Sequence, residues 1–277
     1  MRSVVKGMRR SVGVFDVVAP SRARITVEAG AYERPGVSAG PAPMELMLAS
    51  LVGCAGTTLD SVLAKMRFDV VALNVVADAR RADRVPRVYT DAVLEFHIAT
   101  EAPEERLTHA VAITERTCSA SVMLAQVLTL TPRLVHIRRV EARDTRELRQ
   151  RVLRPHQSVD ELAAEEDSAA TWFAAVLDGE VVGTVSLSPE DSPDDLPADT
   201  PYRLRAMATS EPMRGRGLGT VLLGAAVAHV RAAGGDVVWC SARVAAAAFY
   251  RAAGFVESSD EYEVAHIGPH VRMALRL

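Results

Sequence analysis

A glycine- and arginine-rich segment, Arg214-Gly215-Arg216-Gly217-Leu218-Gly219, has the residue types that bind a phosphate. Glycines let backbone N–H groups approach an anion, because no Cβ stands in the way, and arginines add charge-assisted hydrogen bonds. The alternation in 203–209 predicts a strand before the segment, and the Ala/Leu/Val-rich 220–232 predicts a helix after it. Strand, loop and helix would aim N–H groups and a positive helix end at a phosphate. The alternative is a glycine-rich turn with two solvated arginines.

The spacing of the glycines separates this loop from two other phosphate-binding loops. A Walker loop ends in Gly-Lys-Ser/Thr, and this loop has no lysine. A dinucleotide-binding loop has Gly-x-Gly-x-x-Gly, whereas here the pattern is Gly215-x-Gly217-x-Gly219. The remaining pattern, Arg-x-x-Gly-x-Gly, resembles the acyl-CoA pyrophosphate loop of the GNAT acetyltransferases.

Further segments extend the GNAT resemblance over residues 143–277. The run Ala-Arg-Val-Ala-Ala-Ala-Ala-Phe-Tyr-Arg-Ala-Ala-Gly-Phe at 242–255 resembles the family's Ala-x-x-Phe-Tyr-x-x-x-Gly-Phe helix and turn, and 148–155 and 268–273 resemble one GNAT branch. The resemblance implies an acetyl-CoA-dependent N-acetyltransferase that acts on a small-molecule or peptide amine. It also implies roles for individual residues: a backbone pairing with the pantetheine arm by Met207 and Ala208, a flanking ring from Phe249, and pyrophosphate binding by Arg214, Gly215, Arg216, Gly217, Leu218, Gly219 and Thr220.

The chemistry of acetyl transfer requires few groups. A neutral amine attacks the thioester directly, backbone N–H groups can stabilise the oxyanion, and an acid protonates the departing thiolate. Tyr250 occupies the family's acid position, and a phenol carries a proton at neutral pH; its alternative role is an aromatic packing residue. The general base stays open between Glu190, Glu211 and water. His270 is expected to be structural and Cys240 an inert core residue. A degenerate domain that binds CoA as a sensor is the competing interpretation.

Two cysteines in the first half could carry thiol chemistry. Cys54 lies in an apolar stretch, Met44–Phe68, that predicts a helix buried on all sides, so a small core residue is its simplest role. Cys118 lies among Thr117, Ser119 and Ser121, and these polar neighbours suggest a helix interruption or helix N-terminus. Such a position lowers the pKa of a thiol and favours the nucleophilic thiolate.

Two segments, 40–54 (Gly-Pro-Ala-Pro-Met-Glu-Leu-Met-Leu-Ala-Ser-Leu-Val-Gly-Cys) and 115–124 (Glu-Arg-Thr-Cys-Ser-Ala-Ser-Val-Met-Leu), resemble the signatures of the OsmC/Ohr family. The resemblance spans residues 1–142 and implies an intertwined α+β homodimer. In its peroxidase members one cysteine attacks an organic hydroperoxide and the other resolves the sulfenic acid as a disulfide, which a dithiol reductant reopens. The matching residues are Cys54 as the peroxidatic and Cys118 as the resolving thiol. The alternative is a non-catalytic dimerisation or ligand-binding module.

One residue departs from the peroxidase pattern. Peroxidase members have a glutamate directly after the proline, where this chain has Met44, and the acid follows at Glu45. One residue is a rotation of about 100° on a helix, so Glu45 need not point toward the thiol. Arg22, Arg24 and Arg34 are the candidates for the family's partner arginine.

Bulk composition fits a two-domain globular protein. The chain has 277 residues and a net charge of −3, which favours neither nucleic acid nor an anionic membrane surface. Three cysteines are too few for a disulfide framework, and no Cys/His spacing predicts a metal site. No apolar run is expected to reach the ~20 residues that span a bilayer, so we expect a cytoplasmic protein. The stretch 160–200 is acidic and contains no basic residue; it is either a solvated face or a negative rim that attracts a cationic amine.

The predicted fold class is α+β. An OsmC-like α+β domain (1–142) has two central helices, 44–68 and 103–128, packed on sheets, with strands at 12–18, 23–27, 70–79, 87–99 and 135–140. A GNAT α/β domain (143–277) has a mixed central sheet, which includes the hairpin 171–177 and 180–187 with its Asp178-Gly179 turn. The charged residues 141–150 mark the junction.

Overall fold

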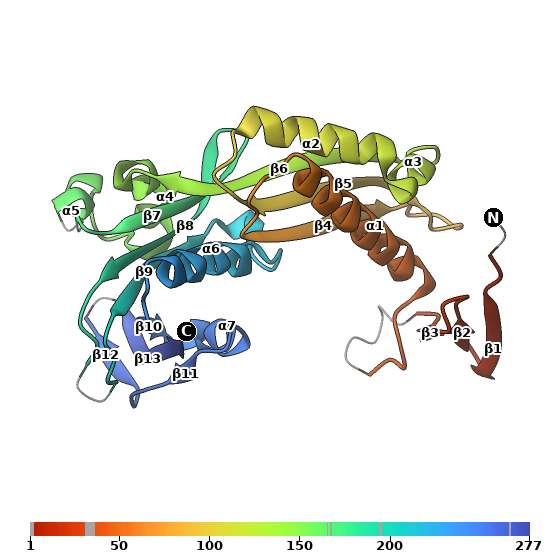
Figure 1. Ribbon diagram of the computed structural model, residues 1–277. Helices are drawn as coiled ribbons and strands as arrows, with labels where there is room; N and C mark the ends of the chain where they lie inside the picture. Colours follow the sequence, from red (N-terminus) through yellow and green to blue (C-terminus); the bar gives the residue numbers. More distant parts are fainter. Residues whose placement is uncertain (1–2, 31–36, 165, 167, 194–195, 266) are drawn as a thin grey trace.

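The computed structural model describes residues 3–30, 37–164, 166, 168–193, 196–265 and 267–277. It opens with a separate three-stranded antiparallel sheet of β1 (Lys6–Ser11), β2 (Val14–Val18) and β3 (Arg24–Glu28). Figure 1 shows this small sheet apart from the rest of the molecule, at the far end of α1 (Pro43–Lys65). Most of its residues are exposed, because within one chain little packs on it.

Helix α1 buries one stripe rather than its whole circumference. Pro43 stands at its first turn, where a missing N–H costs nothing, and Leu51, Ala55, Leu59 and Leu63 are fully buried. Ala49, Gly53 and Thr57 on the opposite side are exposed, and Met47, one turn before Leu51, is 40% exposed. The prediction of a helix buried on all sides is therefore wrong for the single chain. By length and composition α1 is also apolar enough to cross a membrane, contrary to the expected absence of such a run; its buried stripe packs on the first-half core instead.

The rest of the first half contributes three strands to a larger sheet and has its helices on one side of them (Figure 1). Strands β4 (Ala72–Arg81) and β5 (Tyr89–Ala99) are antiparallel, and β5 pairs in parallel with β6 (Thr129–Val140). Between β5 and β6 the chain forms α2 (Glu104–Thr117) and α3 (Ser119–Leu124). The two helices break at Cys118, as its polar neighbours predicted.

The second half adds strands and helices in the expected order. The predicted hairpin is confirmed as β7 and β8, with Asp178 and Gly179 both at positive φ, as a tight two-residue turn requires. The remaining elements are α4 (Arg146–Leu153), α5 (Val159–Ala164), β7 (Thr171–Leu177), β8 (Glu180–Pro189), β9 (Pro201–Thr209), α6 (Leu218–Ala232), β10 (Val237–Arg243), α7 (Ala247–Ala252), β11 (Val256–Glu257), β12 (Tyr262–Val264) and β13 (Gly268–Arg276).

A single ten-stranded sheet joins the two halves, in the order β11-β13-β10-β9-β8-β7-β6-β5-β4, with β12 on β13. Strand β6 pairs with β5 of the first half and with β7 of the second. Helix α6 covers the face of this sheet, and its core includes Ala99, Val135 and Ile137 from the first half. The mixed α+β class is confirmed, and the boundary at residues 142–143 stays a prediction.

Candidate active sites

A cleft opens where β9 and β10 separate. The two strands are parallel and pair over only three positions, from Pro201–Val237 to Arg203–Trp239. Beyond these positions β9 pairs with β8, and β10 pairs with β13. Because the strands diverge, the β9 residues Leu204–Met207 have no partner on the β10 side and line a cavity of about 400 Å³ that Cys240 and Tyr250 also border.

A bulge in β9 re-aims its backbone at this cleft. Thr184 pairs with Ala208 and Ser186 pairs with Arg205, so β9 has one residue more than β8 here. Ala206 takes a left-handed φ of 52°, which costs a non-glycine residue about 1–2 kcal/mol. Such bulges redirect groups next to active sites. The bulge precedes Met207 and Ala208, the residues predicted to pair with the pantetheine arm.

The glycine-rich loop lies at the start of α6, and its last glycine approaches Met207 of this cleft. Gly215 and Gly217 both have φ of 73°, and Gly217 is the N-cap of α6. A Cβ on Gly219 would lie 3.3 Å from the Phe249 ring and 3.5 Å from Met207 Cε. The fold therefore brings together the loop, the bulged strand and the flanking ring that were assigned from three separate stretches of sequence.

Tyr250 is buried at the wall of the cleft and hydrogen-bonds the Cys240 thiol. Phe249 and Phe255 hold its ring edge-on, with centroids 5.1 Å and 5.4 Å away. Burial, and then the neighbouring Cys240, raise the pKa of Tyr250 well above its usual 10.0. Burial also raises the pKa of Cys240 to about 12, which agrees with the predicted inert core residue.

The candidate bases differ in their surroundings. Glu190 Oε1 and Oε2 accept from Arg203 at 2.6 Å and Arg205 at 2.5 Å, so its charge is already balanced. Glu211 lies with the glycine-rich loop, beside a different cavity. His270 donates from Nδ1 to the Gly268 carbonyl at 2.7 Å, which leaves Nε2 as an acceptor in the cleft lining.

The two first-half cysteines lie together. The Cys54 thiol, on α1, is within hydrogen-bonding distance of Cys118, which is fully buried at the break between α2 and α3. Burial raises the pKa of the Cys118 thiol, but hydrogen bonds from Ser121, Cys54 and the Ala120 N–H outweigh it and hold that pKa below its usual value. Both are free thiols in this structure, and a disulfide between them would need only a short movement.

Comparison with known proteins matches each half to a family. Residues 36–133 match OsmC-like proteins, and residues 134–255 match the acetyltransferase (GNAT) family. An uncharacterized N-acetyltransferase, YitI of Bacillus subtilis, is 33% identical over 142 residues, which are 50% of this chain and 95% of that protein. The chain is a GNAT-family acyltransferase with an OsmC-like domain.

Other relatives resemble one half each. Protein YhfA of Escherichia coli K12 is 31% identical over 93 residues, 33% of this chain and 69% of that one. An OsmC-like protein from Mycoplasma pneumoniae has a TM-score of 0.44 at 14% identity, covering 49% of this chain and 97% of its own. The ribosomal-protein-S18-alanine N-acetyltransferase of Escherichia coli has a TM-score of 0.41 at 21% identity, covering 50% and 92%.

Among the described residues, the candidate partners of Cys54 have other places in the structure. Glu45 accepts a hydrogen bond from the Ala42 N–H at 2.7 Å and so caps its own helix, in keeping with the expected rotation away from the thiol. Arg22 and Arg24 are exposed on the small N-terminal sheet, and across the described residues neither hydrogen-bonds Cys54. Arg34 lies outside the described residues.

Sequence reasoning missed a polar contact between the halves. Arg216, in the GNAT loop, reaches the OsmC-like half and pairs with Asp78 at 2.5 Å and Glu95 at 3.2 Å. Asn74 Nδ2 donates to the Arg216 carbonyl at 3.1 Å. No local signal could have shown this, since Asp78 and Arg216 are 138 residues apart in the chain. Arg214 is exposed, and within the described residues its guanidinium has no ion pair.

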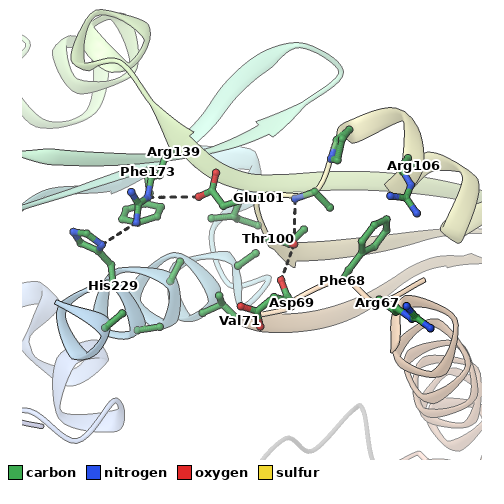
Figure 2. Close-up of a pocket in the computed structure, with 17 residues that line it drawn as sticks. Arg67, Phe68, Asp69, Val71, Thr100, Glu101, Arg106, Arg139, Phe173 and His229 are labelled. Carbon is green, nitrogen blue, oxygen red and sulfur yellow. Dashed lines mark hydrogen bonds and ion pairs between the residues drawn. The ribbon is translucent and has the colours of Figure 1, made fainter. Parts of the chain in front are cut away.

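A second contact between the halves surrounds a cavity of about 740 Å³ (Figure 2). Arg139 of β6 lies 3.6 Å from Glu101 and donates to His229 Nδ1 of α6 at 3.1 Å. Thr100 donates to the Asp69 carbonyl at 2.7 Å. At the other end of the cavity lie Arg67 and Arg106, which have no dashed contact in Figure 2, and the Arg106 guanidinium lies 4.5 Å from the centre of the Phe68 ring.

Proposed function

We propose that the GNAT half transfers an acetyl group from acetyl-CoA to an amine by direct attack on the thioester. The observation that carries the proposal is the meeting of three predicted parts: the bulge before Met207 and Tyr250 line one cleft, and Gly219 at the end of the loop lies next to Met207. The site suits CoA because a Cβ at Gly219 would fill the space beside Phe249, and because Gly215 and Gly217 turn the loop backbone outward.

Each residue then has a chemical task. The N–H groups of the loop and the start of α6, with Arg214, suit a pyrophosphate. The backbone that faces the cleft from Leu204 to Met207, which has no partner on β10, suits a pantetheine amide and a carbonyl oxygen that gains charge. When bound, acetyl-CoA supplies an activated acetyl thioester. Tyr250 keeps its proton at neutral pH and can donate it to a thiolate in the cleft.

A neighbouring cavity supports a site for the acceptor amine. It measures about 460 Å³ and shares Leu153, Arg154, Arg205 and Ala206 with the cleft. Because Glu190 is paired with two arginines and Glu211 lies at the loop, we assign deprotonation of the amine to water.

The test is CoA release from acetyl-CoA with a panel of amines. Amine-dependent release and an acetylated product support the proposal. CoA binding without transfer to any amine in the panel would favour a CoA sensor, and absence of CoA binding would reject the site.

The Cys54–Cys118 contact supports a second activity, reduction of an organic hydroperoxide. The Cys54 thiolate attacks the peroxide, which releases an alcohol and leaves a sulfenic acid. Cys118 then attacks that sulfur, a disulfide forms, and water leaves. A dithiol reductant restores both thiols. Titration of thiols before and after peroxide separates this from a non-catalytic module, since the redox pair loses two of the three thiols.

The OsmC-like half also supports a homodimer. The small N-terminal sheet exposes Met8, Phe15 and Ile25, and α1 leaves an apolar side uncovered. Strand β4 ends the ten-stranded sheet with an open edge, and exposed apolar sheet faces and edges tend to find a partner. Light scattering on the purified chain tests it: a monomer would reject the dimer.

A further inference from the structure

We propose that the OsmC-like half is part of the CoA site: Asp78, Glu95 and Asn74 are positioning residues that hold the pyrophosphate loop through Arg216. The inference rests on the proposed function of the GNAT half. It gives the fusion of the two halves a physical role that neither half implies alone.

The Arg216 side chain is directed at the OsmC-like half. Its Nη2 donates to Asp78 and its Nη1 to Glu95, while its Nε donates to the Pro212 carbonyl at 3.1 Å. The guanidinium therefore spans from the start of the loop to strands β4 and β5. With these contacts made, it is not directed at a phosphate, and the backbone of Arg216 is what the loop offers a ligand.

The Asn74 side chain contacts the backbone of the loop. Its Nδ2 donates both to the Arg216 carbonyl at 3.1 Å and to His97 Nδ1 at 3.1 Å, so both amide hydrogens are used. A Cβ on Gly217 would lie 3.0 Å from the same Nδ2. The side chain of the OsmC-like strand thus lies against the helix N-cap, where only a glycine leaves room for it.

The side chains behind Asn74, those of His97 and Glu95, are buried. His97 Nε2 lies 3.2 Å from Glu95 Oε2, and the side chains of His97 and Glu95 are 0% and 4% exposed. The His97 ring thus links Asn74 on one side to Glu95 on the other. Hydrogen bonds in such a low-dielectric network strengthen one another. The Asp78 and Glu95 carboxylates therefore support the loop and are not ligand-binding groups.

Helix α6 packs on the same strands that carry these side chains. Helix α6, which begins at this loop, packs on strands β4 and β5 of the OsmC-like half, and a Cβ on Gly224 would lie 3.5 Å from Ala72. Helix and loop therefore rest on the same two strands. Because the N–H groups must be held in place to bind an anion well, loosening this support weakens phosphate binding more than it slows the chemistry.

The experiment compares full-length variants by CoA calorimetry and acetyl-transfer kinetics. Asp78→Asn removes the exposed ion pair and Glu95→Gln the buried one. Asp91→Asn is the matched control, because it breaks the Arg80–Asp91 pair (3.0 Å) on the same two strands, away from the loop. We expect the Kd for CoA and the KM for acetyl-CoA to rise roughly threefold for Asp78→Asn and on the order of tenfold for Glu95→Gln, with kcat and the Asp91→Asn values unchanged.

Hydrogen exchange in the ligand-free protein gives a second readout. Asp78→Asn should speed exchange across 214–219 without lowering Tm. Faster exchange with weaker CoA binding supports the proposal. Tighter CoA binding would overturn it, because it would make Arg216 a phosphate ligand that the carboxylates restrain; equal binding and equal exchange would also overturn it. If the wild type binds no CoA, the proposed function fails, and loop exchange alone still decides whether these residues position the loop.

Discussion

Cys118 and Cys240 are both hidden from solvent, but their pKa values shift in opposite directions. Cys118 lies beside Cys54 and Ser121 in the OsmC-like half, and Cys240 lies beside Tyr250 in the GNAT half. The pKa of Cys118 lies below its usual value because N–H groups at the start of α3 point at its sulfur, which outweighs burial. Cys240 lies inside β10, where the ladder uses the N–H groups, and burial raises its pKa to about 12. The two thiols therefore differ because N–H groups at a helix start point at Cys118, whereas Cys240 lies deeper in the core without them.

The largest expected effect is on the peroxide reaction of the OsmC-like half. Cys54→Ser should abolish the peroxide-driven loss of two thiols, because the peroxidatic thiol is removed and no Cys54–Cys118 disulfide can form. The wild type should lose two thiols and Cys240→Ser should also lose two, as measured by thiol titration after stoichiometric hydroperoxide. If peroxide instead consumed the Cys240 thiol and left Cys54 and Cys118 reduced, the proposed difference in reactivity between Cys118 and Cys240 would be wrong.

The next effect is on acetyl transfer. Tyr250→Phe removes the proposed acid but keeps the ring between Phe249 and Phe255, so kcat should fall about 10²-fold while the Kd for CoA stays the same. Steady-state kinetics with the best amine, paired with calorimetry, measures both. Unchanged turnover would make Tyr250 a packing residue only.

Much of the fold followed from local pattern. The β7–β8 hairpin was predicted with its turn in place because alternation and an Asp-Gly turn are local signals, although β8 continues two residues beyond the predicted end at 187. The break at Cys118 was visible for the same reason. Glycine spacing and the Phe249–Tyr250 pair located one cleft from two distant stretches, but the Ala206 bulge that re-aims β9 has no marker residue.

What could not be predicted depends on contacts between distant residues. The exposed side of α1 was missed because composition shows that a helix is apolar but not what covers it in one chain. The ion pairs of Arg216 with Asp78 and Glu95 were missed because they depend on the tertiary fold. Strand β6 pairs with both halves and so places β4 and β5 next to the loop. An arginine in a glycine-rich loop looks the same in sequence whether it faces a phosphate or a carboxylate.

A smaller effect is expected at Cys240 itself. Cys240→Ala removes a buried sulfur and leaves the Tyr250 hydroxyl without its partner, which should lower the free energy of unfolding by about 1–2 kcal/mol. Because the thiol takes no part in transfer, kcat should stay within about twofold of wild type. Denaturant unfolding and kinetics on the same samples measure this; a loss of kcat as large as that of Tyr250→Phe would mean that Cys240 directs the proton.

The smallest expected change is in the alkaline pH profile of acetyl transfer. Tyr250 has a pKa raised well above 10.0 by burial, so the folded enzyme keeps this proton where an exposed tyrosine would lose it. Transfer should rise as the acceptor amine deprotonates and then stay level through pH 10. The same shift lowers stability only above the unfolded pKa, because the unfolded chain ionises first as pH rises, so Tm should be recorded at each pH. A falling limb near 10 in protein that is still folded would mean that Tyr250 titrates as an exposed phenol, and that its contrast with an ordinary tyrosine does not hold.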